Sequence, residues 1–210
     1  MATAFVDGPK SPRPTFDLHL VDSFFPAVHA KAGDAHSSFL SDVLTRNSDL
    51  TPTLEEQTHI TALVSQVQII LENISLDPDA SQVVQMEEFR VVGSFKKGTM
   101  TRGKNEADVV LILRSPPALE SVKQLAFRVS DALSKSACST SLTVQVTDYG
   151  VCITNNGAAA SVRLLLACQD VHPTPAARLH LPPNLLLKHL AAIRHVRWFE
   201  GAFLLRIISS

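Results

Sequence analysis

Residues 93–113 read GSFKKGTMTRGKNEADVVLIL and join a Gly-Ser turn, a basic loop and two acids that lead into an apolar run. Successive side chains of a β-strand point to opposite faces, so Glu106 and Asp108, two positions apart, point the same way. Two carboxylates so placed can hold one hard cation such as Mg²⁺, which prefers carboxylates together with substrate phosphates. The loop before them suits an anionic ligand, because it contains three glycines and the cations Lys96, Lys97, Arg102 and Lys104.

The same residues also fit a purely structural interpretation, in which the four cations form a solvated loop and Glu106 is a surface acid. The Gly-Ser turn favours the ligand-binding interpretation. The composition does not support attraction of an anionic ligand by the whole surface, since a net charge of -1 over 210 residues gives no overall cationic field. Any contact with nucleic acid must therefore come from a local patch.

Three widely spaced cysteines indicate neither a disulfide framework nor a zinc site, and they favour a reducing compartment. The first residues lack the apolar segment of a secretion signal, and no apolar run approaches the roughly 18 to 20 residues that span a bilayer. We therefore expect no membrane partner.

Apolar spacing and turn residues predict the order of the helices and strands. Residues 54–73 form the clearest helix, because Thr53 and Glu56 make a capping-box pair before apolar residues at helical spacing. Residues 88–92 and 107–113 are expected to be central strands, and the second is apolar on both faces, as a strand covered on both sides requires. The other expected elements are helices at 37–46, 118–134 and 184–200, a terminating loop at 47–52, a hairpin of 141–146 with 151–154, a buried strand at 161–167, and an extended or short helical piece at 16–28. This order predicts an α+β fold with a mixed sheet flanked by helices.

The segment GSFKKGTMTRGKNEADVV, residues 93–110, is similar to the template-independent nucleotidyltransferases of the oligoadenylate-synthetase type. It resembles the DZF-domain family still more closely, as do FDLHLVDSFFPAV at 16–28, LTRNSDLTP at 44–52 and LAAIRHVRWFE at 190–200. The resemblance implies a flexible tail at 1–15, a nucleotidyltransferase-like lobe at 16–175, and the start of a helical second lobe at 176–210. Because that lobe is larger in the family, we expect this chain to be truncated, with an uncovered apolar segment after Glu200.

The resemblance also assigns expected roles to individual residues. It implies phosphate or nucleotide binding, with ATP or another nucleoside triphosphate and Mg²⁺ as ligands rather than required cofactors, by Gly93, Ser94, Lys96, Lys97, Thr99 and Arg102. Glu106 and Asp108 match the first two metal-binding carboxylates of active relatives, and the third position holds Arg163. A guanidinium can pair with these carboxylates in place of a metal, whereas two-metal chemistry needs a further acid. Two alternatives stay open: Arg163 extends to solvent at a sheet edge, or one metal binds together with a nucleotide.

The function implied by the resemblance is that of a pseudoenzyme rather than an enzyme. We expect an inactive subunit of a nuclear heterodimer that binds RNA and DNA, including double-stranded RNA, and acts in transcription regulation and RNA metabolism. Its partner would be a larger DZF-domain protein with double-stranded RNA-binding domains or zinc fingers, and the nucleolus and cytoplasm are further compartments. The alternatives are an active Mg²⁺-dependent nucleotidyltransferase and a plain protein-interaction module. The basic residues of 184–200 are expected to be the solvated face of an amphipathic helix.

Overall fold

The computed structural model describes residues 34–77, 85–135, 141–169 and 179–208. The expected tail at 1–15 and the expected element at 16–28 lie outside these residues. The chain divides into two compact units, 1–46 and 47–210. None of the described helices combines the length and the apolarity needed to cross a membrane.

Helix α2, Asp34–Leu50, is longer than the helix expected at 37–46. The prediction of a loop from residue 47 was wrong, because the hydrogen-bonded turns continue until Thr51, whose backbone N–H and side-chain hydroxyl both donate to the Asn47 carbonyl. Pro52 follows, and a proline restricts the residue before it and has no N–H to donate. The stop signal was therefore the proline rather than the polar residues before it.

Five strands of the second unit form a mixed sheet in the order β1-β2-β5-β4-β3. β2 and β5 are parallel, and the other neighbours are antiparallel. The strands are β1 Met86–Val92, β2 Glu106–Leu113, β3 Leu142–Thr147, β4 Gly150–Asn155 and β5 Ala160–Cys168. The expected hairpin is present as β3 and β4, and the expected buried strand is β5.

β2 is an interior strand of this sheet, as predicted, whereas β1 is not. Val109, Val110 and Leu111 are fully buried, which confirms that β2 is covered on both faces. Among the described strands β1 lies at the edge, so its predicted central position was wrong. Its charged Glu88 and Arg90 suit an edge strand, where side chains of this kind oppose pairing with another chain.

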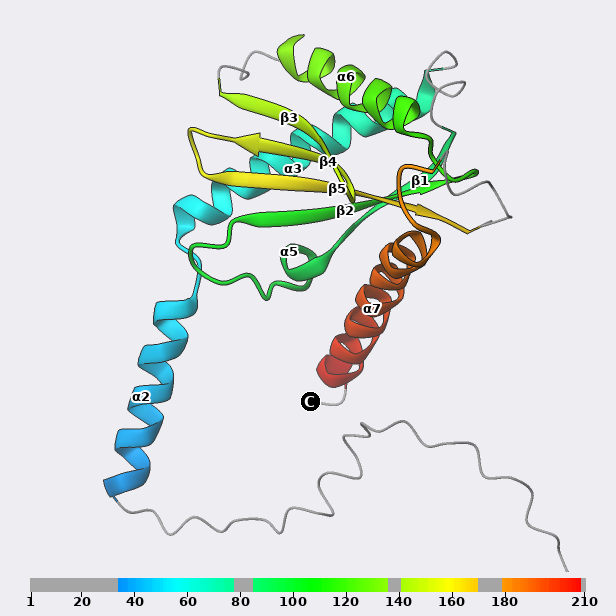
Figure 1. Cartoon of the computed structure of the whole chain (residues 1–210). Coiled ribbons are helices and arrows are strands. Elements are labelled where there is room, and N and C mark those ends of the chain that lie inside the picture. Colours follow the sequence, from blue (N-terminus) through cyan, green and yellow to red (C-terminus); the bar gives the residue numbers. More distant parts are fainter. Residues whose placement is uncertain (1–33, 78–84, 136–140, 170–178, 209–210) are drawn as a thin grey trace, which may run out of the picture. The chain divides into compact units, whose positions relative to one another are not determined.

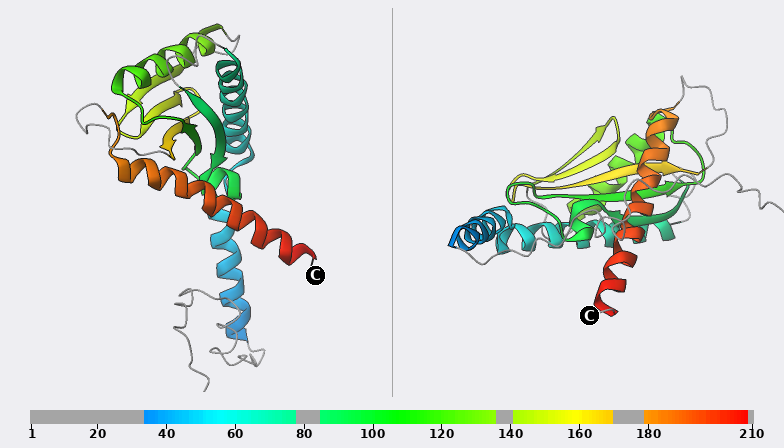
Figure 2. Two further views of the ribbon diagram at one scale, coloured as in Figure 1. Left: turned by 90° about the vertical axis from the view of Figure 1, so that its right-hand side faces the viewer. Right: turned by 90° about the horizontal axis from the view of Figure 1, so that it is seen from below.

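Helices cover both faces of the sheet (Figures 1 and 2). α3 Leu54–Leu76 and α6 Leu119–Lys135 share one hydrophobic core with the face of β2 that carries Val109 and Leu111. α7 Pro183–Ile208 packs on the other face, where Ile193 and Val196 meet Val110 and Ile112. The remaining helix, α5 Gly93–Lys97, is a single short segment between β1 and β2.

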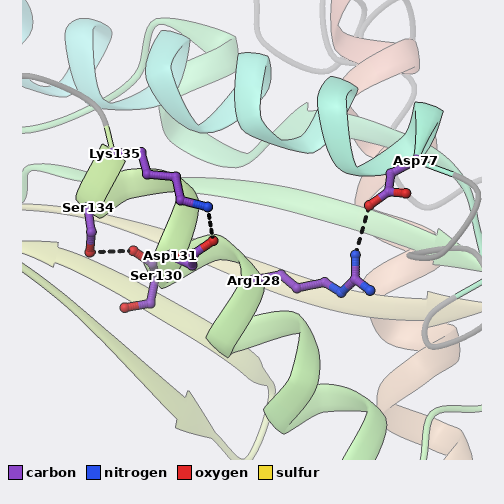
Figure 3. A network of polar contacts seen from close by, with 6 residues as sticks. All are labelled: Asp77, Arg128, Ser130, Asp131, Ser134 and Lys135. Atoms are coloured by element: carbon purple, nitrogen blue, oxygen red, sulfur yellow. Dashed lines mark hydrogen bonds and ion pairs between the residues drawn. The ribbon is translucent and has the colours of Figure 1, made fainter.

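The capping box predicted at the start of α3 is present, and the helix runs three residues beyond its expected end at 73. Its C-cap residue Asp77 pairs with Arg128 of α6, with 2.9 Å between Nη1 and Oδ2 (Figure 3). Farther along α6, Lys135 binds Asp131 one turn earlier at 2.6 Å. The Asp77–Arg128 pair thus joins the end of α3 to α6 beyond their shared apolar core, whereas the Lys135–Asp131 pair lies within α6.

α7 is longer than the helix expected at 184–200, because it continues through Gly201 to Ile208. Gly201 lowers helix propensity, but it is followed by residues with good propensity and no proline. The expectation that the basic residues form an exposed face holds for Arg194 and Arg197, while Leu186, Ile193 and Val196 are buried. The side chains of 203–208, expected to be uncovered, lie outside the described side chains.

Candidate functional site

The Gly-Ser turn places the backbone directly against the carboxylate of Asp108. Strand β1 ends at Val92, which is the register partner of Asp108 in β2. Gly93 then takes a φ of +73°, a conformation that residues with a side chain rarely adopt. A Cβ atom at this position would lie 2.6 Å from Asp108 Oδ2. Glycine is thus required twice, for the backbone conformation and for the space that the carboxylate occupies.

Helix α5 ends after five residues at Gly98, which has a φ of +65° and caps the helix in the left-handed conformation. The Gly98 N–H donates to the carbonyls of Ser94 and Phe95, and the Thr99 N–H donates to Ser94 at 2.9 Å. These bonds fix the path of the chain from the Gly-Ser turn into the basic loop. The side chains of Ser94 and Thr99 are exposed to solvent, where a ligand can reach them.

Arg163 of β5 lies directly beside the two acids of β2. Asp108 and Arg163 are register partners on parallel strands, so their side chains leave the sheet on the same face. Arg163 donates from Nε to Asp108 Oδ1 at 2.7 Å and from Nη2 to Oδ2 at 3.1 Å. Its third nitrogen, Nη1, lies 3.3 Å from Glu106 Oε2. The expected ion pair is therefore present, and Arg163 does not extend to solvent from an edge strand.

The electrostatics of this trio are consistent with its geometry. The hydrogen bond to Asp108 raises the pKa of Arg163, the charges of Asp108 and Glu106 act in the same direction, and burial opposes them. The Asp108 side chain is 18% exposed and that of Glu106 is 53% exposed. Asp108 is the principal partner, because its pair has two short hydrogen bonds and less contact with water.

The acids of β2 are paired with a cation in this structure. Both oxygens of Asp108 accept hydrogen bonds from the Arg163 guanidinium. Within the part of the chain that the structure describes, no three His, Cys, Asp or Glu side chains gather in a way that could hold a metal ion. Of the two other acids that could supply a third carboxylate, Asp148 therefore does not complete such a set, and Asp170 lies outside the described residues.

Sequence reasoning missed two contacts of the segment between β1 and β2, one made by α5 and one by the loop that follows it. Lys96 Nζ lies 3.0 Å from Glu200 Oε1 of α7. One of the cations expected to bind phosphate is therefore already paired with a carboxylate. The Glu56 carboxylate, recognised only as half of a capping box, also accepts the Gly103 N–H at 2.9 Å. Neither contact has a local sequence signal, because each joins residues that are far apart in the chain.

Next to Arg163, on the side away from Asp108, lie two further groups that the sequence did not single out. Cys152 of β4 is the register partner of Arg163, and Tyr149 lies in the turn before β4. Burial, with a hydrogen bond between Tyr149 and Cys152, raises the pKa of Tyr149 to about 12, so its hydroxyl stays protonated at neutral pH.

A cavity of about 410 Å³ opens beside Glu106, within the size range of small-ligand sites. Thr154 and Ser161 supply hydroxyl groups to its wall, and Lys104 supplies a cation. Asn105 also lines it; this residue is 7% exposed, and its amide atoms have no hydrogen-bond partner among the described residues. The polar side chains of the sheet face thus border a space in which a ligand can lie.

A mixed sheet with a Gly-Ser turn into a short helix, followed by two acids on the next strand, defines a nucleotidyltransferase-like protein, and the predicted fold class is confirmed. The chain belongs to the DZF family: the family model of the DZF N-terminal domain matches residues 2–202.

Several solved nucleotidyltransferase-fold structures are similar in fold. An Escherichia coli CdnC–HORMA complex has a TM-score of 0.46 at 17% identity, covering 63% of this chain and 42% of CdnC. The Vibrio cholerae cyclic AMP-GMP synthase DncV has a TM-score of 0.40 at 15% identity, covering 58% and 47%. The CdnE c-di-GMP synthase of Capnocytophaga granulosa has a TM-score of 0.37 at 21% identity, covering 58% and 36%. The chain matches less than half of the length of each.

Proposed function

We propose that this protein is a catalytically inactive nucleotidyltransferase-like subunit that keeps a binding site for nucleotide phosphates. The observation that carries the proposal is the contact of Arg163 with both Asp108 and Glu106. Two carboxylates and one guanidinium leave a net charge of -1, because two negative charges are offset by one positive charge. This is too little to balance two divalent cations, and the guanidinium cannot be deprotonated to make room for them.

The phosphate-binding part of the proposal rests on the loop after the Gly-Ser turn. Lys97 is half-buried, and Arg102 and Lys104 are exposed on a backbone whose turns are fixed by hydrogen bonds. Cations on a fixed loop beside a cavity suit a triphosphate such as that of ATP. We propose ATP or another nucleoside triphosphate as the ligand, with Mg²⁺ carried by the phosphates rather than by a protein site.

The wider role follows from the family and not from the geometry. We propose that the chain acts within a nuclear heterodimer with a larger DZF-domain protein that has double-stranded RNA-binding domains or zinc fingers. Its targets would be RNA and DNA, in transcription regulation and RNA metabolism. The near-neutral charge of the chain supports a division of labour in which the partner makes most of the nucleic-acid contacts.

One observation favours the second candidate, an active template-independent nucleotidyltransferase. Glu106 and Asp108 keep the spacing and the shared sheet face that metal-binding carboxylates require. Magnesium-dependent transfer of labelled nucleotide by the full chain, abolished by Asp108→Ala, would establish that candidate and overturn the first.

Calorimetric titration with ATP, with and without Mg²⁺, tests the proposal on the wild type, Arg163→Asp and the matched control Arg163→Gln. We expect the wild type to bind ATP in both conditions and Arg163→Asp to gain Mg²⁺-dependent binding, since it adds a third acid beside Asp108. Arg163→Gln removes the cation without adding an acid and should gain less. If the wild type does not bind ATP, or if Lys97→Glu leaves binding unchanged, the site has no ligand role and the chain is an interaction module.

A further inference from the structure

The basic loop, residues 98–105, is held to the start of helix α3 by a carboxylate outside the loop. Figure 1 shows this loop between α5 and β2, running past the beginning of α3. Glu56 stands three residues after the N-cap Thr53, and its two oxygens bind different partners. Oε2 accepts the Thr53 N–H at 2.8 Å, and Oε1 accepts the Gly103 N–H at 2.9 Å. One side chain therefore completes the helix cap and joins it to a residue 47 positions later.

The neighbouring backbone contacts act on the same loop. The Arg102 N–H donates to the Leu50 carbonyl at 2.8 Å, and the Lys104 N–H donates to Thr101 at 3.0 Å. The far end is fixed where the Ser161 N–H of β5 donates to Asn105 at 2.9 Å. The N–H groups of residues 102, 103 and 104 are thus all bonded, and Glu56 supplies the one side-chain acceptor among these three bonds.

We propose that Glu56 is a positioning residue that fixes the conformation of the basic loop and so presents Arg102 and Lys104 to a bound phosphate. The inference rests on the proposed phosphate-binding function of that loop. It assigns to Glu56 a role that a capping box alone does not have. The Thr53 and Gly103 N–H groups favour its charged form and lower the pKa of Glu56, with a smaller effect from the Arg102 charge.

Position and charge predict opposite effects when Glu56 is changed. Glu56 is a negative charge near Arg102, so its removal should strengthen the binding of an anion if charge were all that mattered. If Glu56 positions the loop, its removal should weaken binding, because the cations would lose their fixed arrangement. The sign of the change in ATP affinity therefore distinguishes a positioning role of Glu56 from a simple charge effect.

Glu56→Gln is the decisive variant, and Thr53→Ala is its matched control. The Thr53 and Gly103 N–H groups bind different oxygens of Glu56, and in Gln one of these oxygens is replaced by an NH2 group that only donates, so the two bonds cannot both be kept in this arrangement. Thr53→Ala removes the hydroxyl that accepts the Glu56 N–H at 3.2 Å but leaves the carboxylate and its contact with Gly103 in place. Both variants weaken the helix cap, and only the first alters the link to the loop.

The experiment measures amide exchange at Gly103 and Arg102 by NMR, and ATP affinity by calorimetry, on the full chain. We expect Glu56→Gln to speed Gly103 exchange by at least about tenfold and to weaken ATP binding by at least about threefold, with Thr53→Ala near the wild type in both. Unchanged Gly103 exchange in Glu56→Gln, tighter ATP binding, or an equal effect of Thr53→Ala would overturn the inference.

The failure of this inference can be distinguished from failure of the proposed function. If the wild type does not bind ATP while Glu56→Gln speeds Gly103 exchange, the proposed phosphate site is wrong and the positioning role falls with it, leaving a structural link alone. If the wild type binds ATP and Glu56→Gln binds it equally well, the site stands and the role of Glu56 is refuted.

Discussion

Arg163 and Asp108 face each other as register partners on the parallel strands β5 and β2, joined by two hydrogen bonds of 2.7 and 3.1 Å. Asp108 also leaves no room for a side chain at Gly93, where a Cβ atom would lie 2.6 Å from Asp108 Oδ2. Asp108 is therefore enclosed by a cation on one side and by a glycine on the other. Because both neighbours belong to the chain itself, the contribution of Asp108 to the free energy of unfolding can be measured without a ligand.

Asp108→Ala should lower the free energy of unfolding by about 1–2 kcal/mol, because Arg163 loses two charge-assisted hydrogen bonds in a partly buried setting. Glu106→Ala is the matched control. Its contact with Arg163 is longer and more exposed, so it should cost less than about 1 kcal/mol. Urea denaturation of both variants measures the difference, and equal losses would show that the two acids share the guanidinium evenly.

Gly93→Ala should destabilise the protein by about 2–3 kcal/mol, since the new Cβ meets Asp108 Oδ2 and the backbone has a positive φ. Gly98→Ala offers the comparison, because Gly98 also has a positive φ but nothing lies within 4 Å of its Cβ. It should cost about 1 kcal/mol. Thermal or urea unfolding would contradict this account if the two alanines were equally costly.

Acid should release the loop from α3. The pKa of Glu56 is lowered in the folded protein, chiefly by the N–H groups of Thr53 and Gly103. A group of this kind stabilises the fold above its ordinary pKa, and the effect is lost as the pH falls through the lowered folded value. Gly103 exchange, corrected for its intrinsic pH dependence, should stay slow at neutral pH and rise below the usual range of a glutamate carboxyl. In Glu56→Gln this step should be missing.

Glu200→Gln should strengthen ATP binding by up to about fivefold, because it frees Lys96 from a half-exposed ion pair of modest strength. Glu87→Gln changes the overall charge equally, but Glu87 pairs with Arg114 at the other end of β1. It should leave the affinity unchanged at moderate salt. Calorimetry on both variants tests whether Lys96 contributes to the site, and an equal rise in affinity would point to net charge instead.

Local sequence patterns determined most of the helices and strands of this protein. The capping box fixed the start of α3, and the apolar run after Asp108 identified a buried strand. Each of these signals is contained within a few consecutive residues. The Gly-Ser turn and the paired acids likewise identified the class of fold. Where prediction failed, as at the edge position of β1 and the extended end of α7, the outcome depended on strand order or on weak stop signals.

Only the tertiary structure decided which distant residues meet. The resemblance placed Arg163 in the third position, but its contact with Asp108 requires β5 to lie parallel to β2 in one register, and a shift of one residue would turn the side chain to the other face. The contacts of Glu56 with Gly103 and of Lys96 with Glu200 depend equally on how separate elements pack. The sequence alone specified the elements because their signals are local, whereas the site was specified by strand register and packing, which join residues far apart in the chain.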